Sequence, residues 1–290
     1  MAPKPETLAQ RILRRARRLL PPAAFRIVLE RCRGGSGIEI GGPSAVFRRW
    51  NLWPLYPVVR TLDNYNFARR TIWSSQEGPA LGLYREQFIG EASEMTDIPS
   101  AAYDFVLASH VLEHMANPLK ALHSWARVVR PGGMIVLVAP HHDGTFDHRR
   151  PLTTMDHIVS DFHGDVTERD ETHVQEILNL HDLRLDPGAG TADAFVARAR
   201  NNLEHRSLHH HVFDTELVLK LADKADLRIL YVDVELPFHI CVACSSPVTD
   251  VEREGDDMPP NPSYWAPGAA WRRRTPFRSD RRSGEGWGFL

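Results

Sequence analysis

Three histidines that closely follow apolar runs are the first candidates for chemistry in this chain of 290 residues. His110 follows the run Tyr103–Ser109, and His141 and His142 follow the run Met134–Ala139. The imidazole group titrates near neutral pH, so it is well suited to take a proton from a hydroxyl group. We predict a general base among these three histidines. Histidines at such positions also serve as structural residues, which is the alternative for each of them.

A glycine turn follows an acidic strand near the start of the chain. Glu39 lies in the apolar run Gly37–Ile40, which ends on Gly41 and Gly42. Glycine has no Cβ, so a ligand can approach the backbone closely at this turn. Asp63 closes a second apolar run 24 positions after Glu39. In a βαβ nucleotide-binding unit, an acid about 20 residues after the turn is placed to take both ribose hydroxyls. A helix or turn cap is the alternative for Asp63.

A cluster of His and Asp residues after the run Met134–Ala139 has the ligand chemistry of a metal site. Its members are His141, His142, Asp143, Asp147 and His148. Their spacing matches no tight metal-binding template, and acidic histidine-rich loops are commonly solvated. We therefore predict no catalytic metal at this cluster.

These candidates are positioned by alternating apolar runs and amphipathic segments. Seven apolar runs indicate strands, over residues 37–40, 58–63, 87–92, 103–109, 134–139, 227–235 and 238–245. Helices are expected after Asn117-Pro118 and over residues 214–225. The last two strands are joined by only Leu236-Pro237 and must be antiparallel, because parallel strands need a crossover of about a dozen residues. The pattern predicts an α/β fold with a doubly wound, Rossmann-like sheet of seven strands whose last strand is antiparallel.

Residues 141–212 interrupt this alternation. They contain eleven of the fifteen histidines, and helices are expected near residues 171–181 and 192–206. A segment of this length is too long for a plain connection, so we predict a mainly helical insertion after the fifth strand that forms a lid or pocket wall.

The two ends of the chain differ in composition from the predicted central domain, residues 34–246. Residues 1–33 hold nine Lys/Arg and two Glu and predict basic helices that pack on the domain, with membrane contact as the less favoured alternative. Residues 247–290 are rich in Pro, Gly and Arg and predict a loosely held tail. No apolar run is long enough to span a membrane, and three cysteines are too few for a disulfide framework. We expect a cytoplasmic protein with reduced cysteines.

Several short motifs occur in the order found in one enzyme family. They are Glu39-Ile40-Gly41, Asp63, Gly90-Glu91-Ala92, Ser109–His114 and Arg127–Gly133. The set resembles the class I S-adenosylmethionine-dependent methyltransferases, type 11, over about residues 35–140 and 213–246. The resemblance implies S-adenosylmethionine as cofactor. It also implies a cofactor site formed by Glu39, Gly41, Gly42, Ser44, Asp63, Glu91, Ala92 and Ser109.

The glycine turn departs from the family pattern at two positions. This chain has Pro43 and Ala45 where the family usually carries glycines. Proline fixes φ near −65° and offers no N–H, so the loop must meet the methionine end of the cofactor differently. Ser44 is the candidate for that contact.

The resemblance implies transfer of a methyl group to a small molecule or sugar. We expect oxygen as the acceptor atom, because histidines are available to deprotonate a hydroxyl. A net charge of −2 and the lack of a basic channel argue against nucleic acid as substrate. Two alternatives remain: a non-catalytic binding module that keeps the fold, and the same fold with another nucleotide.

Overall fold

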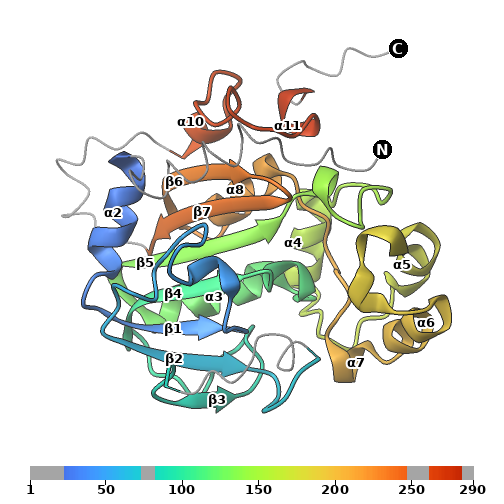
Figure 1. The fold of residues 1–290 in the computed structure, drawn as a ribbon, viewed down its shortest axis with the longest axis horizontal. Coiled ribbons are helices and arrows are strands. Elements are labelled where there is room, and N and C mark those ends of the chain that lie inside the picture. Colours follow the sequence, from blue (N-terminus) through green and yellow to red (C-terminus); the bar gives the residue numbers. More distant parts are fainter. Residues whose placement is uncertain (1–22, 73–81, 247–260, 283–290) are drawn as a thin grey trace.

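The computed structural model describes residues 23–72, 82–246 and 261–282. Their strands form one sheet of seven in the order β3-β2-β1-β4-β5-β7-β6 (Figure 1). The strands are β1 (Ser36–Ile40), β2 (Thr61–Asn66), β3 (Gln87–Ile89), β4 (Tyr103–Ser109), β5 (Val129–Pro140), β6 (Arg228–Glu235) and β7 (His239–Ser245). Strands β1 to β5 pair in parallel, and β7 is antiparallel to both β5 and β6. The predicted α/β fold with an antiparallel last strand is confirmed.

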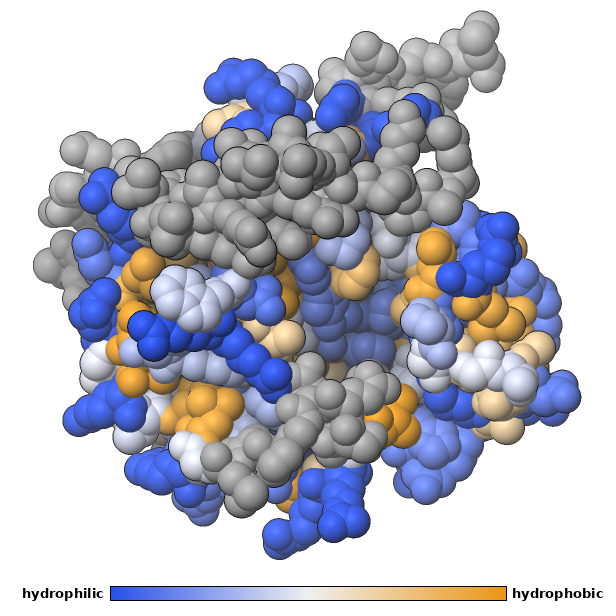
Figure 2. Space-filling model, viewed as in Figure 1, coloured by the Kyte–Doolittle hydropathy of each residue, from blue (hydrophilic) through white to orange (hydrophobic). Residues whose placement is uncertain are grey.

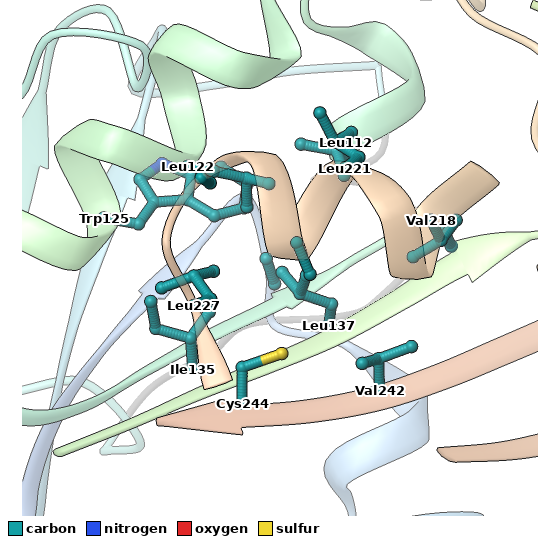
Figure 3. Close-up of a cluster of buried hydrophobic side chains, with 14 of the residues drawn as sticks. Leu112, Leu122, Trp125, Ile135, Leu137, Val218, Leu221, Leu227, Val242 and Cys244 are labelled. Carbon is teal, nitrogen blue, oxygen red and sulfur yellow. The ribbon is translucent and has the colours of Figure 1, made fainter. Parts of the chain in front are cut away.

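Both faces of the sheet are buried, because alternate side chains of each strand enter different cores. On β4, Val106 packs in the cluster that contains helices α3 (Pro118–Val128) and α8 (Thr215–Lys224). Figure 3 shows this cluster between the two helices and the sheet. Its neighbour Leu107 packs in a second cluster with helix α2 (Ala23–Cys32).

The same alternation separates the two cysteines of β7. Cys244 lies in the first cluster and Cys241 in the second. Both are buried and free, which confirms the prediction of reduced core residues. Burial raises the pKa of each thiol, so neither is a reactive nucleophile.

The two helix starts predicted from the sequence, at Asn117-Pro118 and at Asp214, are confirmed. The side chain of Asn117 accepts a hydrogen bond from Lys120 N at 3.0 Å and caps α3, with Pro118 in the first turn. Asp214 caps α8 in the same way through Leu217 N at 2.8 Å. These caps place α3 and α8 directly after segments that contribute to the cavity described below.

Strand β2 differs from its prediction by three residues. It begins at Thr61 and continues through Asp63 to Asn66, whereas the sequence suggested residues 58–63. Asp63 was expected at the end of the strand, and a carboxylate inside a buried strand is costly unless it is paired. It does not end the strand, because Arg85 and Tyr103 pair with it inside the fold.

The segment between β5 and α8 contains four helices. They are α4 (Met155–His163), α5 (Val174–Leu180), α6 (Ala192–Arg200) and α7 (Asn202–His205). Helices α5 and α6 pack around a small core of their own, which includes Ile177 and Phe195. In Figure 1 helices α5 to α7 lie beyond the carboxyl ends of the parallel strands.

The C-terminal prediction was wrong for residues 261–282. This stretch contains α10 (Pro262–Trp265) and α11 (Ser279–Arg282), and Trp271 and Phe277 are buried in the same cluster as α3 and α8. Proline, glycine and arginine content suggested weak attachment, but the few aromatic residues supply the packing.

The division of the chain into domains stays a prediction, and the basic segment up to residue 22 lies outside the described residues. Over the described ranges, no helix combines the length and apolar character needed to cross a membrane.

Candidate active site

A cavity of about 570 Å³ lies at the carboxyl ends of the parallel strands. Its walls come from the loop after β1, the ends of β2 and β4, the turn after β3, and the insertion. Figure 2 shows a hollow between the sheet and the insertion helices on this face. The volume falls within the range of small-molecule and cofactor sites, about 300–1,000 Å³. The carboxyl edge of an open α/β sheet is also the usual place for such a ligand.

The loop after β1 has the backbone geometry that requires glycine. Gly41 and Gly42 have φ values of +75° and +60°, and both line the cavity. A Cβ at Gly42 would lie 2.5 Å from the Glu39 side chain and from the Tyr84 hydroxyl. A side chain at Gly42 would collide with the groups beneath the loop, so glycine allows the loop to keep this shape beside the cavity.

Glu39 supports this loop from below and does not reach the cavity. Its fully buried carboxylate accepts hydrogen bonds from Ser44 Oγ (2.6 Å), Ser44 N (3.1 Å), Tyr56 OH (2.7 Å) and Tyr84 OH (2.7 Å). Burial raises the pKa of Glu39, and these hydrogen bonds oppose the shift. Ser44 lines the cavity, but its hydroxyl proton is committed to Glu39. Pro43 is thus held in a loop that is shaped by a carboxylate network.

The ribose-binding role expected of Asp63 does not agree with its position. Asp63 is buried away from the cavity, where it accepts from Arg85 Nε (3.0 Å), Arg85 Nη2 (2.6 Å) and Tyr103 OH (2.9 Å). The residue at the carboxyl end of β2 is Asn66, and it lines the cavity. The shift follows from the later start and end of the strand, which move the cavity position three residues along the chain.

Three other predicted cofactor residues, Glu91, Ala92 and Ser109, do line the cavity. Glu91 is paired with Arg206 of the insertion, at 2.6 Å and 3.2 Å. Arg206 also lies 3.2 Å from Glu168, so one guanidinium bridges the rim and the insertion. This bridge holds the insertion against the cavity.

Four polar side chains meet on the other side of the cavity. Three of them, His110, Glu113 and His114, follow β4, and the fourth, His209, comes from the insertion. Glu113 Oε1 lies 3.5 Å from His110 Nδ1 and 4.0 Å from Nε2 of both His114 and His209. His110 Nε2 also lies 3.0 Å from His239 Nδ1.

The ionisation of this group is shifted by burial and by its neighbours. Burial would raise the pKa of Glu113, but His110, His114 and His209 hold it below its ordinary value. Burial lowers the pKa of His114 to about 4, which keeps that ring neutral at pH 7. Burial opposes a charge on His209, but the neighbouring Asp147 raises its pKa. Shifts of this kind in a cavity are typical of functional sites.

The position of His141 speaks against its predicted role as a base. The ring is fully buried and stacks on Phe277 at a centroid distance of 3.9 Å. Its Nδ1 accepts from Asp143 N at 3.1 Å, and its Nε2 lies 3.1 Å from Asp280. The chain turns under the C-terminal segment directly after β5, so this ring points away from the cavity.

His142 also lies outside the cavity. Its Nε2 donates to the carbonyl of Arg150 at 3.0 Å, and its Nδ1 lies 3.1 Å from Asp143 Oδ1. Both ring nitrogens therefore have structural partners. Of the three histidines predicted to be catalytic, only His110 lines the cavity.

Sequence reasoning missed Asn66, Glu113, His114, Arg206 and His209. Glu113 and His114 both belong to the motif Ser109–His114, which pointed to His114 only as a structural or cofactor-lining residue and indicated no role for Glu113. The run of three histidines at positions 209–211 was a signal, because such a run in an acidic insertion is an unusual composition. Nothing local in the sequence pairs Arg206 with Glu91, which lies 115 positions away.

Comparison with known proteins agrees with this geometry. The family model described as a methyltransferase domain matches residues 64–137. No curated protein matches the chain.

Among solved structures, a SAM-dependent methyltransferase from Aquifex aeolicus is similar, with 13% identity and a TM-score of 0.43 over 81% of this chain and 96% of that chain. The 1,6-didemethyltoxoflavin-N1-methyltransferase of Burkholderia thailandensis, solved with 1,6-didemethyltoxoflavin and S-adenosylhomocysteine, has 12% identity and a TM-score of 0.43 over 79% and 80%. A Mesorhizobium loti S-adenosylmethionine-dependent methyltransferase has 11% identity and a TM-score of 0.44 over 77% and 95%.

The sheet order, the cavity at its carboxyl edge and the family match define the class of protein. They indicate a class I S-adenosylmethionine-dependent methyltransferase, with S-adenosylmethionine as the cofactor. The resemblance inferred from the motifs is confirmed, and the family match favours an enzyme over a non-catalytic module.

Proposed function

We propose that this enzyme methylates a hydroxyl oxygen of a small molecule, with sugars as one candidate class. The observation that carries the proposal is the position of His110. Its ring lies in the cavity, next to the glycine loop, and its Nδ1 faces the buried carboxylate of Glu113 at 3.5 Å. A histidine beside a carboxylate is well suited to take a proton from a hydroxyl.

Residues on the β1–β2 side of the cavity suit the cofactor. Gly41 and Gly42 shape the loop after β1, Asn66 offers an amide at the ribose position, and Ala92 and Ser109 line the same wall. When bound, S-adenosylmethionine supplies a methyl group on a positively charged sulfur, and this group leaves as a neutral thioether without help from an acid. The main task of the protein is therefore to align the acceptor oxygen with that methyl group.

The acceptor side is assigned to the histidines. In the tautomer where His110 Nδ1–H points toward Glu113, the Nε2 of His110 carries the lone pair, which faces His239 Nδ1 at 3.0 Å. His110 would take the hydroxyl proton at Nε2 when the acceptor replaces His239 there, and Glu113 would stabilise the imidazolium that results. The oxygen keeps the electron pair that forms the new bond to carbon.

The charges of the cavity favour a small neutral acceptor. Among the described residues, the two arginines of its lining are both paired with acids, Arg198 with Asp186 at 3.0 Å and Arg206 with Glu91 at 2.6 Å. Unpaired basic side chains along a groove are what a nucleic acid backbone requires. The pairing therefore supports a small molecule over RNA or DNA.

The proposal can be tested by measuring S-adenosylhomocysteine release with a panel of hydroxylated small molecules, followed by mass spectrometry of the products. We expect His110→Ala to lower turnover at least a hundredfold, within the usual range for a lost general base of about 10²–10⁴-fold. His163→Ala, a change of an exposed histidine on α4, is the matched control and should keep full turnover. Methylation only at nitrogen or carbon, or full turnover of the His110 variant, would refute the proposal.

A further inference from the structure

Glu113 has an unusual environment for a buried carboxylate. It is fully buried, and among the described residues neither of its oxygens has a hydrogen-bond partner. Native structures rarely leave a buried carboxylate in this state, because its desolvation needs a compensating donor or cation. A cation bound directly to Glu113 would supply that compensation, which the histidines at 3.5–4.0 Å give only through their charge.

Two histidines beside Glu113, His114 after β4 and His209 in the insertion, can each direct a ring nitrogen without a hydrogen toward it. His114 Nδ1 lies 2.9 Å from the carbonyl oxygen of Leu208, which can only accept, so this nitrogen carries the hydrogen. His209 Nδ1 is hydrogen-bonded to the carboxylate of Asp147, which fixes the hydrogen there by the same argument. In their neutral forms both rings then direct an Nε2 lone pair toward Glu113, from 4.0 Å.

Two imidazole nitrogens and a carboxylate with lone pairs facing one point form the ligand set of a metal ion. The three ligand atoms lie within 4.8 Å of one another. Ligands at 2.0–2.2 Å from one ion are about 3–4 Å apart, so a small closure of the side chains completes the set. Leu208 and Asp147 play the part of the outer hydrogen-bond partners that orient metal-bound histidines.

We propose that Glu113, His114 and His209 bind one divalent transition-metal ion in the cavity. Imidazole ligands favour ions such as Zn²⁺, Co²⁺, Ni²⁺ or Fe²⁺ over Mg²⁺ and Ca²⁺, which prefer oxygen. All three residues line the cavity, so the remaining coordination positions face the space available to the acceptor. There the ion would hold an acceptor oxygen beside His110. This role rests on the proposed function, whereas binding of the ion does not.

A second group of three, His157, Asp161 and His211, lacks this arrangement. His211 Nε2 lies 3.3 Å from the carbonyl of Ala116 and therefore carries a hydrogen instead of a lone pair. His157 Nε2 is shared with His173 at 3.2 Å. We expect no metal at this group, which makes it an internal control.

The site also differs from the cluster considered in the sequence. Of that cluster, His141 pairs with Asp280, His148 with Asp182, and Asp147 with His209. These residues point to separate partners. Only Asp147 contributes to the proposed site, as the support of a ligand.

The test is titration of the purified full chain, after dialysis against a chelator, with Co²⁺ and Zn²⁺ in a calorimeter and without cofactor or acceptor. We expect one equivalent to bind, and the visible absorption of bound Co²⁺ to indicate nitrogen and oxygen ligands. Glu113→Gln and His209→Asn should each weaken binding at least tenfold. Asp147→Asn should weaken it about 10- to 100-fold, as for other outer partners of metal-bound histidines.

Asp161→Asn, in the second group, should leave the affinity unchanged and serves as the matched control. Circular dichroism and the melting temperature establish that each variant is folded, and the Glu113 and His209 variants are independent of each other. Absence of saturable binding by the folded wild type up to millimolar metal would overturn the proposal. Loss of binding in Asp161→Asn with retention in Glu113→Gln would also overturn it. Metal binding without methyl transfer to any hydroxyl would leave the site standing and refute only the proposed function.

Discussion

Asn66, rather than Asp63, lies where the cofactor ribose is expected, and this difference leads to a direct test of the cofactor site. Asn66 stands at the cavity end of β2, and we expect its amide to hydrogen-bond the ribose hydroxyls of S-adenosylmethionine. Each neutral hydrogen bond contributes about 0.5–1.5 kcal/mol, so loss of two should cost about 1–3 kcal/mol. Asn66→Ala should therefore weaken cofactor binding about 5- to 150-fold.

Asp63→Ala should behave in the opposite way. Its carboxylate lies outside the cavity, so cofactor affinity should stay within about 0.5 kcal/mol of the wild type. The variant leaves the Tyr103 hydroxyl without its partner at 2.9 Å, which should lower the free energy of unfolding by about 1–3 kcal/mol. The bond to Arg85 adds less than its short distance suggests, because 63% of that side chain is exposed.

Isothermal titration with S-adenosylmethionine and thermal unfolding of the same samples separate the two effects. We expect Asn66→Ala to change the dissociation constant and Asp63→Ala to change the melting temperature. The reasoning fails if folded Asp63→Ala loses cofactor affinity while Asn66→Ala keeps it. That result would mean that β2 ends at Asp63 in the bound enzyme.

Three further predictions test the loop, the buried histidines and the pH dependence. Gly42→Ala should lower cofactor affinity in titration, because its Cβ would overlap Glu39 at a φ of +60°; unchanged affinity would show that the loop can move. His141→Ala should lower the free energy of unfolding by about 1–3 kcal/mol, since the ring stacks on Phe277, and should keep turnover per folded molecule; lost turnover would return His141 to the catalytic site. Burial lowers the pKa of His211 well below its ordinary value of 6.5. The unfolded chain then binds more protons below pH 6.5, so the free energy of unfolding should fall as the pH drops from there, and a wild-type slope in His211→Gln would contradict this.

The number of strands and most of their boundaries followed from local pattern. The run Tyr103–Ser109 and the Asn117-Pro118 cap were predictable because apolar alternation and capping depend on near neighbours. The end of β2 was not predictable in this way. Asp63 is tolerated inside the sheet only because Arg85 and Tyr103 reach it, and those residues are 22 and 40 positions away.

The prediction of a loosely held C-terminal tail was wrong for a related reason. Its composition resembles a weakly packed tail, yet Asp280 is fully buried and accepts hydrogen bonds from Thr215 and Thr275. Composition measures how much apolar surface a segment has to bury, whereas packing depends on where that surface meets a partner. Trp271 and Phe277 find such a partner in the core beside α8.

The insertion explains why the site itself was only half predictable. Residues at strand ends, such as His110 and Ser109, could be placed at the carboxyl edge from the order of the strands alone. The insertion then completes both ends of the cavity from a distance, through Arg206 at Glu91 and through His209 at Glu113. Because each contact joins a rim residue to the insertion, a ligand that binds between them gains from both walls at once. The insertion therefore completes both parts of the site, and we expect variants of Arg206 to weaken cofactor binding without altering the base.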